Sequence, residues 1–237
     1  MLLEINDLNT YYDESRVLQD MSLKVDHGEI VALLGRNGMG KSTTLKSIMG
    51  LVTPRSGKVI YKGKDITGFP PYKVAKTGIG YVPEERWIFP TLTVMENLVM
   101  GIKGGKIDKN NPNAWTVEKI FKHFPSLEQR QKSKGANLSG GEQQMLAVGR
   151  SLMGNPDLIL VDEPTEGLAP LLKREVRDML ESISKTGVSI LLVEHNLKVA
   201  MSLANRVYVM KKACVAFAGK VEELAAHDEI RKKHLEI

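Results

Sequence analysis

A glycine-rich stretch with one lysine, GRNGMGKST at residues 35–43, carries the clearest chemical signal in the sequence. It fits the spacing G-x-x-x-x-G-K-[ST] and lies between an apolar stretch typical of a strand and a stretch that predicts a helix. Glycines let backbone N–H groups wrap a chain of phosphates, and a helix N-terminus adds partial positive charge. Lys41 adds a full charge, Ser42 can place its hydroxyl on magnesium, and Thr43 can donate to the α-phosphate. The predicted nucleotide-binding residues are Gly35, Asn37, Gly38, Gly40, Lys41, Ser42 and Thr43.

Two acids end a second apolar stretch, LILVDEP at residues 158–164. A nucleoside triphosphate needs its metal held and its attacking water oriented. Asp162 suits the magnesium shell, and Glu163 is the best candidate for polarising the water. Two carboxylates at a strand end can also be ordinary solvated loop residues, and the dipeptide alone leaves both interpretations open.

A histidine follows the next predicted strand, at position 195 in VSILLVEH. Neutral imidazole can donate to a γ-phosphate or bond a neighbouring carbonyl. A lone histidine at a strand end is often incidental, so His195 is a candidate because its strand follows the acidic one.

The stretch NLSGGEQQM at residues 137–145 has two readings. Ser139 and Glu142 have the spacing of a capping box, in which each side chain bonds the other residue's backbone N–H. Gly140 and Gly141 cost helix stability, yet they would let an anion approach the free N–H groups closely. The sequence by itself therefore predicts either a plain helix cap or a second phosphate site.

The order of the predicted elements defines the fold class. The first thirty residues favour strands, a helix is predicted from Lys41 to about Met49, and a hairpin around residues 62–64. Residues 87–154 have helical periods, with a polar loop expected at 103–113. After Pro156 strands and helices alternate, which indicates a parallel sheet with helices on both faces. We expect one α/β unit interrupted by a mostly helical insert.

Composition excludes several classes of protein. The 237 residues contain no apolar run near the ~18 needed to cross a bilayer. The N-terminus MLLEINDLNTYY has no secretory signal pattern, so a cytoplasmic location is expected. The net charge of +5 is scattered and aromatic residues make up 5% of the chain, which disfavours nucleic-acid binding. One cysteine, Cys214, allows no intrachain disulfide and is most simply a strand residue.

Taken in order, these motifs resemble the nucleotide-binding subunits of ATP-binding cassette (ABC) transporters over essentially the whole chain. GRNGMGKST is similar to the Walker A motif, LSGGEQQ to the family signature, LILVDEP to Walker B, EGLAP to the D-loop, and His195 to the switch histidine. The resemblance implies a single nucleotide-binding domain over 1–237. It would have a P-loop NTPase core of RecA-like type (1–86 and 155–237), an N-terminal antiparallel β subdomain and a helical subdomain (about 87–154).

The resemblance also implies ATP, Mg²⁺ and a second subunit. In this family two cassettes pack head to tail, and the signature of one faces the ATP in the other's phosphate loop, so Ser139, Gly140 and Gly141 would serve the partner's nucleotide. Tyr12 aligns with the aromatic residue that stacks on adenine, although Tyr11 is adjacent. Glu84 occupies the place of a glutamine that approaches magnesium or water.

Within the family, VPEERWIFPTLTVMENL and DEPTEGLAP are most similar to the second ATPase subunit (the LivF type) of branched-chain amino-acid importers. Cassettes of urea and amide importers are close alternatives. Three positions depart from common patterns: Glu84 for glutamine, Ala169 for a D-loop aspartate, and His195 where several members of this subgroup have glutamine. The loss of the aspartate makes unequal ATP sites plausible.

The implied function is an ATPase motor subunit bound to permease subunits on the inner face of the cell membrane, with no contact to the transported solute. RWIFPTLTV, residues 86–94, would be a small satellite core or would line the groove in which a permease helix docks. Two competing classes fit less well. A soluble ABC ATPase usually has two cassettes or a long coiled coil, and a P-loop kinase would leave the signature unexplained.

Overall fold

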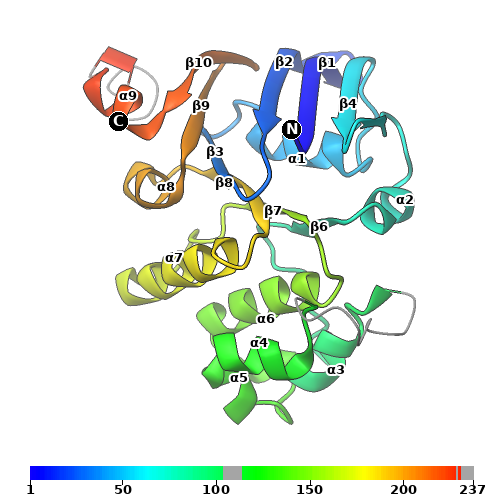
Figure 1. Cartoon of the computed structure of the whole chain (residues 1–237), viewed down its shortest axis with the longest axis vertical. Coiled ribbons are helices and arrows are strands. Elements are labelled where there is room, and N and C mark those ends of the chain that lie inside the picture. Colours follow the sequence, from blue (N-terminus) through cyan, green and yellow to red (C-terminus); the bar gives the residue numbers. More distant parts are fainter. Residues whose placement is uncertain (104–113, 228, 231–237) are drawn as a thin grey trace.

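The computed structural model describes residues 1–103, 114–227 and 229–230, and Figure 1 shows the whole chain. Most of the loop expected at 103–113, and the basic tail at 231–234, lie outside the described residues. The described part contains two sheets, helices that pack around them, and a group of helices set apart from the first sheet.

The first sheet is antiparallel and lies at the N-terminal end of the fold. Its strand order is β2-β1-β4-β5. The strands are β1 (Leu3–Tyr12), β2 (Ser15–Val25), β4 (Ser56–Tyr61) and β5 (Lys64–Asp65). β4 and β5 pair around residues 62–63, which confirms the predicted hairpin, and the sheet confirms the expected antiparallel β subdomain.

The second sheet has six strands in the order β10-β9-β3-β8-β7-β6. Its strands are β3 (Ile30–Leu34), β6 (Ile79–Val82), β7 (Leu158–Asp162), β8 (Ser189–Glu194), β9 (Arg206–Lys211) and β10 (Cys214–Lys220). All neighbours pair in parallel except β9 and β10. Every residue of β3, β7 and β8 is buried, as expected for strands covered on both faces. Cys214 begins β10, so it is the strand residue that the sequence predicted.

Helices cover this core on both sides. They are α1 (Lys41–Ile48), α2 (Pro71–Lys76), α7 (Pro170–Ser184), α8 (Leu197–Leu203) and α9 (Val221–Ala226). The sequence predicted α1, α7 and α8. It missed the six-residue α2, because a segment that short with a proline at its start gives little periodicity.

The insert is helical where it is described. It contains α3 (Val94–Val99), α4 (Val117–His123), α5 (Pro125–Gln129), the 3-10 turn η2 (Gly135–Asn137) and α6 (Gly140–Leu152). In Figure 1 these green elements lie together at the end of the molecule away from β1, β2 and β4. Their apolar side chains join one core with α7. The subdomain boundaries at 87 and 154 stay a prediction.

The parallel sheet brings three strand ends together. β3 pairs with β8 and β8 with β7, so the loops that follow Leu34, Asp162 and Glu194 leave the sheet at the same edge. Open α/β sheets bind ligands outside the carboxyl ends of their strands. None of the described helices has the length and apolar composition needed to cross a membrane.

Candidate functional site

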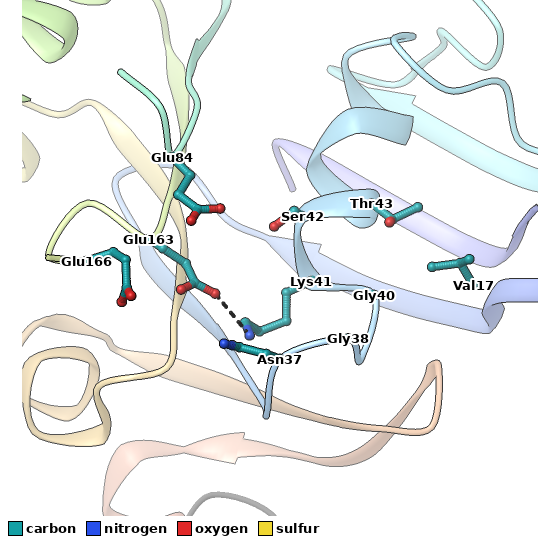
Figure 2. A pocket seen from close by; sticks show the side chains of 10 residues that line it. All are labelled: Val17, Asn37, Gly38, Gly40, Lys41, Ser42, Thr43, Glu84, Glu163 and Glu166. Atoms are coloured by element: carbon teal, nitrogen blue, oxygen red, sulfur yellow. Dashed lines mark ion pairs between the residues drawn. The ribbon is translucent and has the colours of Figure 1, made fainter. Parts of the chain in front are cut away.

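The glycine-rich stretch connects β3 to α1 and lines a cavity of about 250 Å³. Gly40 precedes α1 with a φ of 97°, in the left-handed region that favours glycine. A Cβ there would lie 2.7 Å from the Val17 carbonyl oxygen and 2.8 Å from Leu18. The turn therefore needs glycine for both its conformation and its close approach to β2. The cavity is lined by Val17, Asn37, Gly38, Gly40, Lys41, Ser42, Thr43, Glu84, Glu163 and Glu166 (Figure 2).

Lys41 is the buried cation of this cavity, with 4% of its side chain exposed. Its Nζ lies 3.1 Å from Glu163 Oε1 and donates to the carbonyl of Gly35 at 2.9 Å. A further hydrogen bond goes to the Arg36 carbonyl at 3.3 Å. Gly35, a predicted phosphate-loop residue, thus contributes a lysine acceptor and is not among the cavity-lining residues. In a buried setting the ammonium is held in one place by these three oxygen atoms.

Ser42 and Asp162 join the loop to the end of β7. Ser42 Oγ donates to Asp162 Oδ1 at 3.0 Å, although the two residues are 120 positions apart. Burial raises the pKa of Asp162 to about 6, and the carboxylates of Glu163 and Glu84 act in the same direction, against the hydrogen bond from Ser42. Figure 2 shows Glu84 and Glu163 together across the cavity from Ser42. Hydroxyl and carboxylate oxygens are the ligands that Mg²⁺ prefers, so this donor set fits that ion.

Glu163 is held in a left-handed backbone conformation, with φ 42°, which is uncommon for a residue with a side chain. Its N–H donates to the Val193 carbonyl at 2.9 Å, which ties it to β8. His195 Nδ1 lies 2.9 Å from Glu163 Oε2, and His195 Nε2 lies 3.2 Å from Glu166 Oε2. The imidazole therefore sits between two carboxylates and orients the one that lies beside Lys41.

Two contributors were missed by sequence reasoning. Glu166 lines the cavity and contacts His195, and its only sequence signal is its place three residues after Glu163. Glu194 is fully buried and accepts from the Thr165 hydroxyl at 2.6 Å and the Thr165 N–H at 3.2 Å. Burial raises the pKa of Glu194, against these bonds. This pair fixes the segment after Glu163 to the end of β8.

The two adjacent tyrosines of β1 differ in surroundings. Arg55 Cζ lies 3.9 Å from the centre of the Tyr11 ring, so Tyr11 already has a cation stacked on it. Tyr12 is 44% exposed and lies outside the set of residues that line the cavity. This contrast leaves Tyr12 as the ring that is free to stack on a base.

The signature residues form the first turn of α6. Ser139 Oγ accepts from the Glu142 N–H at 3.3 Å, and Glu142 Oε2 accepts from the Ser139 N–H at 2.8 Å, so the capping box is present. Gly141 also has a packing reason, because a Cβ there would lie 2.8 Å from Leu172 of α7. None of Ser139, Gly140 and Gly141 lines the phosphate-loop cavity. The first turn of α6 therefore lies apart from the residues that line the phosphate-loop cavity.

Ala169, the departure in the D-loop, is the residue before α7. It gives that helix no side-chain cap, whereas an aspartate there would accept from the first-turn N–H groups.

A second cavity, a groove of about 340 Å³, lies between the parallel sheet and the insert. Phe89 and Met100 on its wall are 43% and 61% exposed, and Trp87 nearby is 54% exposed. Ile88 instead packs against the core of the insert. The 86–94 segment therefore packs partly on the core of the insert, not on a separate satellite core, and partly lines a groove; docking of a permease helix there stays a prediction.

Comparison with known proteins agrees with this geometry. Residues 18–166 match the family model described as ABC transporter. The chain is 38% identical to the high-affinity branched-chain amino acid transport ATP-binding protein BraG of Pseudomonas aeruginosa, over 99% of both chains. It is 37% identical to the probable branched-chain amino acid transport ATP-binding protein LivF of Archaeoglobus fulgidus, over 98% of this chain and 97% of that protein. The lipopolysaccharide export system ATP-binding protein LptB of Escherichia coli K12 is 31% identical, over 98% and 96%.

Solved structures have the same fold. A nucleotide-free ATP-binding cassette from an ABC transporter superposes with a TM-score of 0.82 at 27% identity, over 97% of this chain and 96% of that one. A dimeric cassette bound to ADP and Pi, in a post-hydrolysis state, has a TM-score of 0.79 at 25% identity, over 93% and 99%. From the family match, the full-length relatives and the nucleotide cavity together, the chain belongs to the ABC transporter family and is an ATP-binding, ATP-hydrolysing cassette.

Proposed function

We propose that this cassette is one of the ATPase subunits of an importer for branched-chain amino acids. The observation that carries the proposal is full-length similarity to BraG and LivF at 37–38% identity, against 31% for LptB, which serves lipopolysaccharide export. The transported solute would contact the membrane subunits and not this chain. The cassette would lie in the cytoplasm, peripheral to the inner face of the cell membrane.

An uptake experiment tests the cargo. Cells that lack the gene should lose uptake of radiolabelled leucine, and the wild-type gene should restore it while Glu163→Gln should not. Loss of labelled urea uptake in place of leucine uptake would favour the urea-importer alternative and contradict the proposal.

The proposed reaction begins with nucleotide placement. The phosphate loop would hold the phosphates of ATP, with Gly38 and Gly40 giving backbone N–H access and Asn37 and Thr43 offering polar side chains on the cavity wall. Lys41 would contact the terminal phosphates, because it is the buried cation of the cavity. The exposed ring of Tyr12 would stack on adenine.

Ser42, Asp162 and Glu84 would hold Mg²⁺, which supplies charge neutralisation on the phosphate oxygens. Glu84 brings negative charge where other cassettes have a neutral amide. A divalent cation would offset that charge, and it would favour ionised Asp162 against the burial and the neighbouring carboxylates that raise its pKa.

Glu163 would accept a proton from the attacking water, since its carboxylate lies between the phosphate-loop lysine and His195. His195 would orient this carboxylate and reach towards the γ-phosphate. Its contact with Glu166 fixes the ring from the other side. General-base assistance of this kind is worth about 10²–10⁴-fold in rate.

A second cassette would complete each site. Ser139, Gly140 and Gly141 lie outside the chain's own cavity, which supports the head-to-tail arrangement in which they bind the partner's ATP. A Glu163→Gln variant should keep ATP binding, slow hydrolysis about 10²–10⁴-fold and so accumulate the ATP-bound dimer. Light scattering should then show a shift towards dimer with ATP and not with ADP. A variant that stays monomeric with ATP, both alone and with its second cassette, would contradict the arrangement.

The apolar groove would receive a cytoplasmic helix of the permease. Exposed Phe89, Met100 and Trp87 support this, since soluble proteins rarely gather large apolar side chains on one surface without a partner. Substituting Met100→Glu should release the cassette from the membrane subunits and leave its ATP affinity unchanged. Release can be measured by flotation of reconstituted vesicles.

A further inference from the structure

Arg86 lies beside the signature turn, a place that no nucleotide role yet explains. It follows Glu84 by two residues in the loop between β6 and α3. A Cβ placed on Gly140, the first residue of α6, would lie 3.6 Å from Arg86 Nη1 and 3.7 Å from Nη2. Leu168 of the D-loop segment lies equally close to that point, at 3.5 Å. The guanidinium is therefore at the junction of the D-loop and the signature.

The position of the Arg86 side chain is fixed by its backbone conformation and by a hydrogen bond to α6. Arg86 and Trp87 have φ values of 63° and 44°, two consecutive left-handed residues that are not glycine. Such a conformation is strained and persists only where surrounding contacts impose it. Arg86 Nε donates to Oε1 of Gln144 at 3.3 Å, and Gln144 is 1% exposed on the inner face of α6. The loop thus turns sharply to present the guanidinium at the first turn of this helix.

The charge at this point is unbalanced in the free subunit. Among the described residues, no acidic side chain forms an ion pair with Arg86. Glu142, the one acid in the first turn of α6, is already engaged by the Ser139 N–H at 2.8 Å and by Arg130 at 3.6 Å. A helix N-terminus carries partial positive charge, so a cation beside it is unfavourable unless an anion binds to both the cation and the helix N-terminus.

We infer that Arg86 is a further phosphate-binding residue, whose guanidinium contacts the γ-phosphate of the ATP held in the partner subunit's phosphate loop. The inference rests on the proposed head-to-tail dimer, in which that phosphate faces Gly140. Arg86 then adds a full positive charge to the partial positive charge of the helix N-terminus. It also offsets the negative charge that Glu84 adds to the composite site.

The test uses the full chain with Glu163→Gln, in which ATP drives dimerisation. Adding Arg86→Gln should raise the dimer dissociation constant in ATP about tenfold or more, because a charge-assisted bond to phosphate is lost at each of two sites. The affinity of the monomer for a fluorescent ATP analogue should stay within about twofold, since Arg86 does not line the chain's own cavity. Arg177→Gln removes a charge on α7 that pairs with its neighbour Asp178, and it is the matched control.

Arg86→Lys separates charge from scaffolding. If the guanidinium binds phosphate, lysine should restore most of the ATP-driven dimerisation, because it keeps the cation. Equal loss with lysine and glutamine would show that Arg86 only positions α6 through Gln144, and no loss with glutamine would remove it from the site; either result overturns the inference. If the Glu163→Gln protein with Arg86 intact never dimerises in ATP, with or without its second cassette, the head-to-tail proposal itself has failed.

Discussion

Resemblance to the family leads us to expect that the phosphate-loop cavity and the signature turn both contact the phosphates of ATP. The two regions are nevertheless built differently. In the cavity Lys41 pairs with Glu163, Ser42 with Asp162, and His195 with two carboxylates, all within one chain. The signature turn offers a capped helix end, two glycines and a nearby guanidinium that has no acidic partner among the described residues. The first region is held together by contacts within the chain, whereas the second presents groups whose proposed ligand belongs to another molecule.

This difference teaches how a site can be divided between subunits. Asp162, Glu163 and His195, for which we propose roles in metal binding and catalysis, lie at strand ends of the parallel sheet. The residues proposed to complete the partner's site lie on the insert, whose group of helices is set apart from the first sheet in Figure 1. Damage to the two regions should therefore have separable effects.

Ser139→Arg should have the largest effect and sharpens the comparison. The bulky cation would block the turn that faces the partner's nucleotide, so hydrolysis should fall to background while the isolated subunit still binds ATP. Nucleotide affinity by fluorescence and turnover by phosphate release measure the two separately. Loss of ATP binding by the monomer would mean that the signature belongs to the chain's own site.

Lys41→Ala should act in the opposite pattern. It removes the cation placed among the phosphates and leaves Glu163, a mostly buried carboxylate, without its ion pair. ATP binding should weaken sharply and turnover should fall at least about a hundredfold. The same two assays apply, with Lys185→Ala on the exposed end of α7 as the control. Unchanged affinity together with unchanged turnover would refute the phosphate-loop assignment.

Tyr12→Ala should have a smaller effect on binding alone. Stacking of a base on an aromatic ring is worth about 1–3 kcal/mol, so ATP affinity should fall roughly five- to a hundredfold. Tyr11→Ala is the matched control, because that ring is occupied by Arg55 and should leave affinity nearly unchanged. If Tyr11 proves the more sensitive residue, the adenine contact has been assigned to the wrong tyrosine.

Asp162→Asn should have the smallest of these effects, a change in the free energy of unfolding. Whether the variant is more or less stable than the wild type is informative. The folded-state pKa of about 6 lies above the ordinary aspartate pKa of 3.8, so this carboxyl binds protons more tightly in the folded state. Its contribution to stability is present at low pH and is lost as pH rises through about 4 to 6. At pH 7.5 the neutral amide should therefore stabilise the nucleotide-free protein by about 1–2 kcal/mol.

The gain should vanish near pH 4, where the carboxyl of Asp162 is protonated. Thermal unfolding at the two pH values measures it. Magnesium-dependent hydrolysis should be lost in the same variant at either pH. Destabilisation at pH 7.5 would show that the bond from Ser42 outweighs the cost of burying the charge.

Much of this molecule could be predicted from patterns of residues. Fully apolar strands, the helix after the phosphate loop and the alternation after Pro156 all follow from periodicity, because burial on two faces requires continuous apolar runs. The strand-end acids were found because the chemistry of a triphosphate requires them. The six-residue α2 left too few residues for a pattern, whereas the β4–β5 hairpin was predicted from its turn.

Other features depend on tertiary contacts that no local pattern encodes. The left-handed backbone of Glu163 follows from its tie to β8, and Glu166 becomes relevant only because His195 lies beside it. The choice between Tyr11 and Tyr12 depends on where Arg55, distant in sequence, places its guanidinium. Gly141 has a packing reason that only the tertiary structure shows, because a Cβ there would lie 2.8 Å from Leu172.

The buried ion pair between Lys41 and Glu163 makes nucleotide entry an exchange reaction. If Lys41 binds phosphate as proposed, an incoming triphosphate would compete with the carboxylate for the ammonium, and it would free the proposed base as it binds. A nucleotide without a terminal phosphate offers less compensation for breaking this pair, because separating buried charges is expensive. On the proposed mechanism, the nucleotide-free subunit would keep Glu163 neutralised by Lys41, and the carboxylate would become available as a base only when ATP binds.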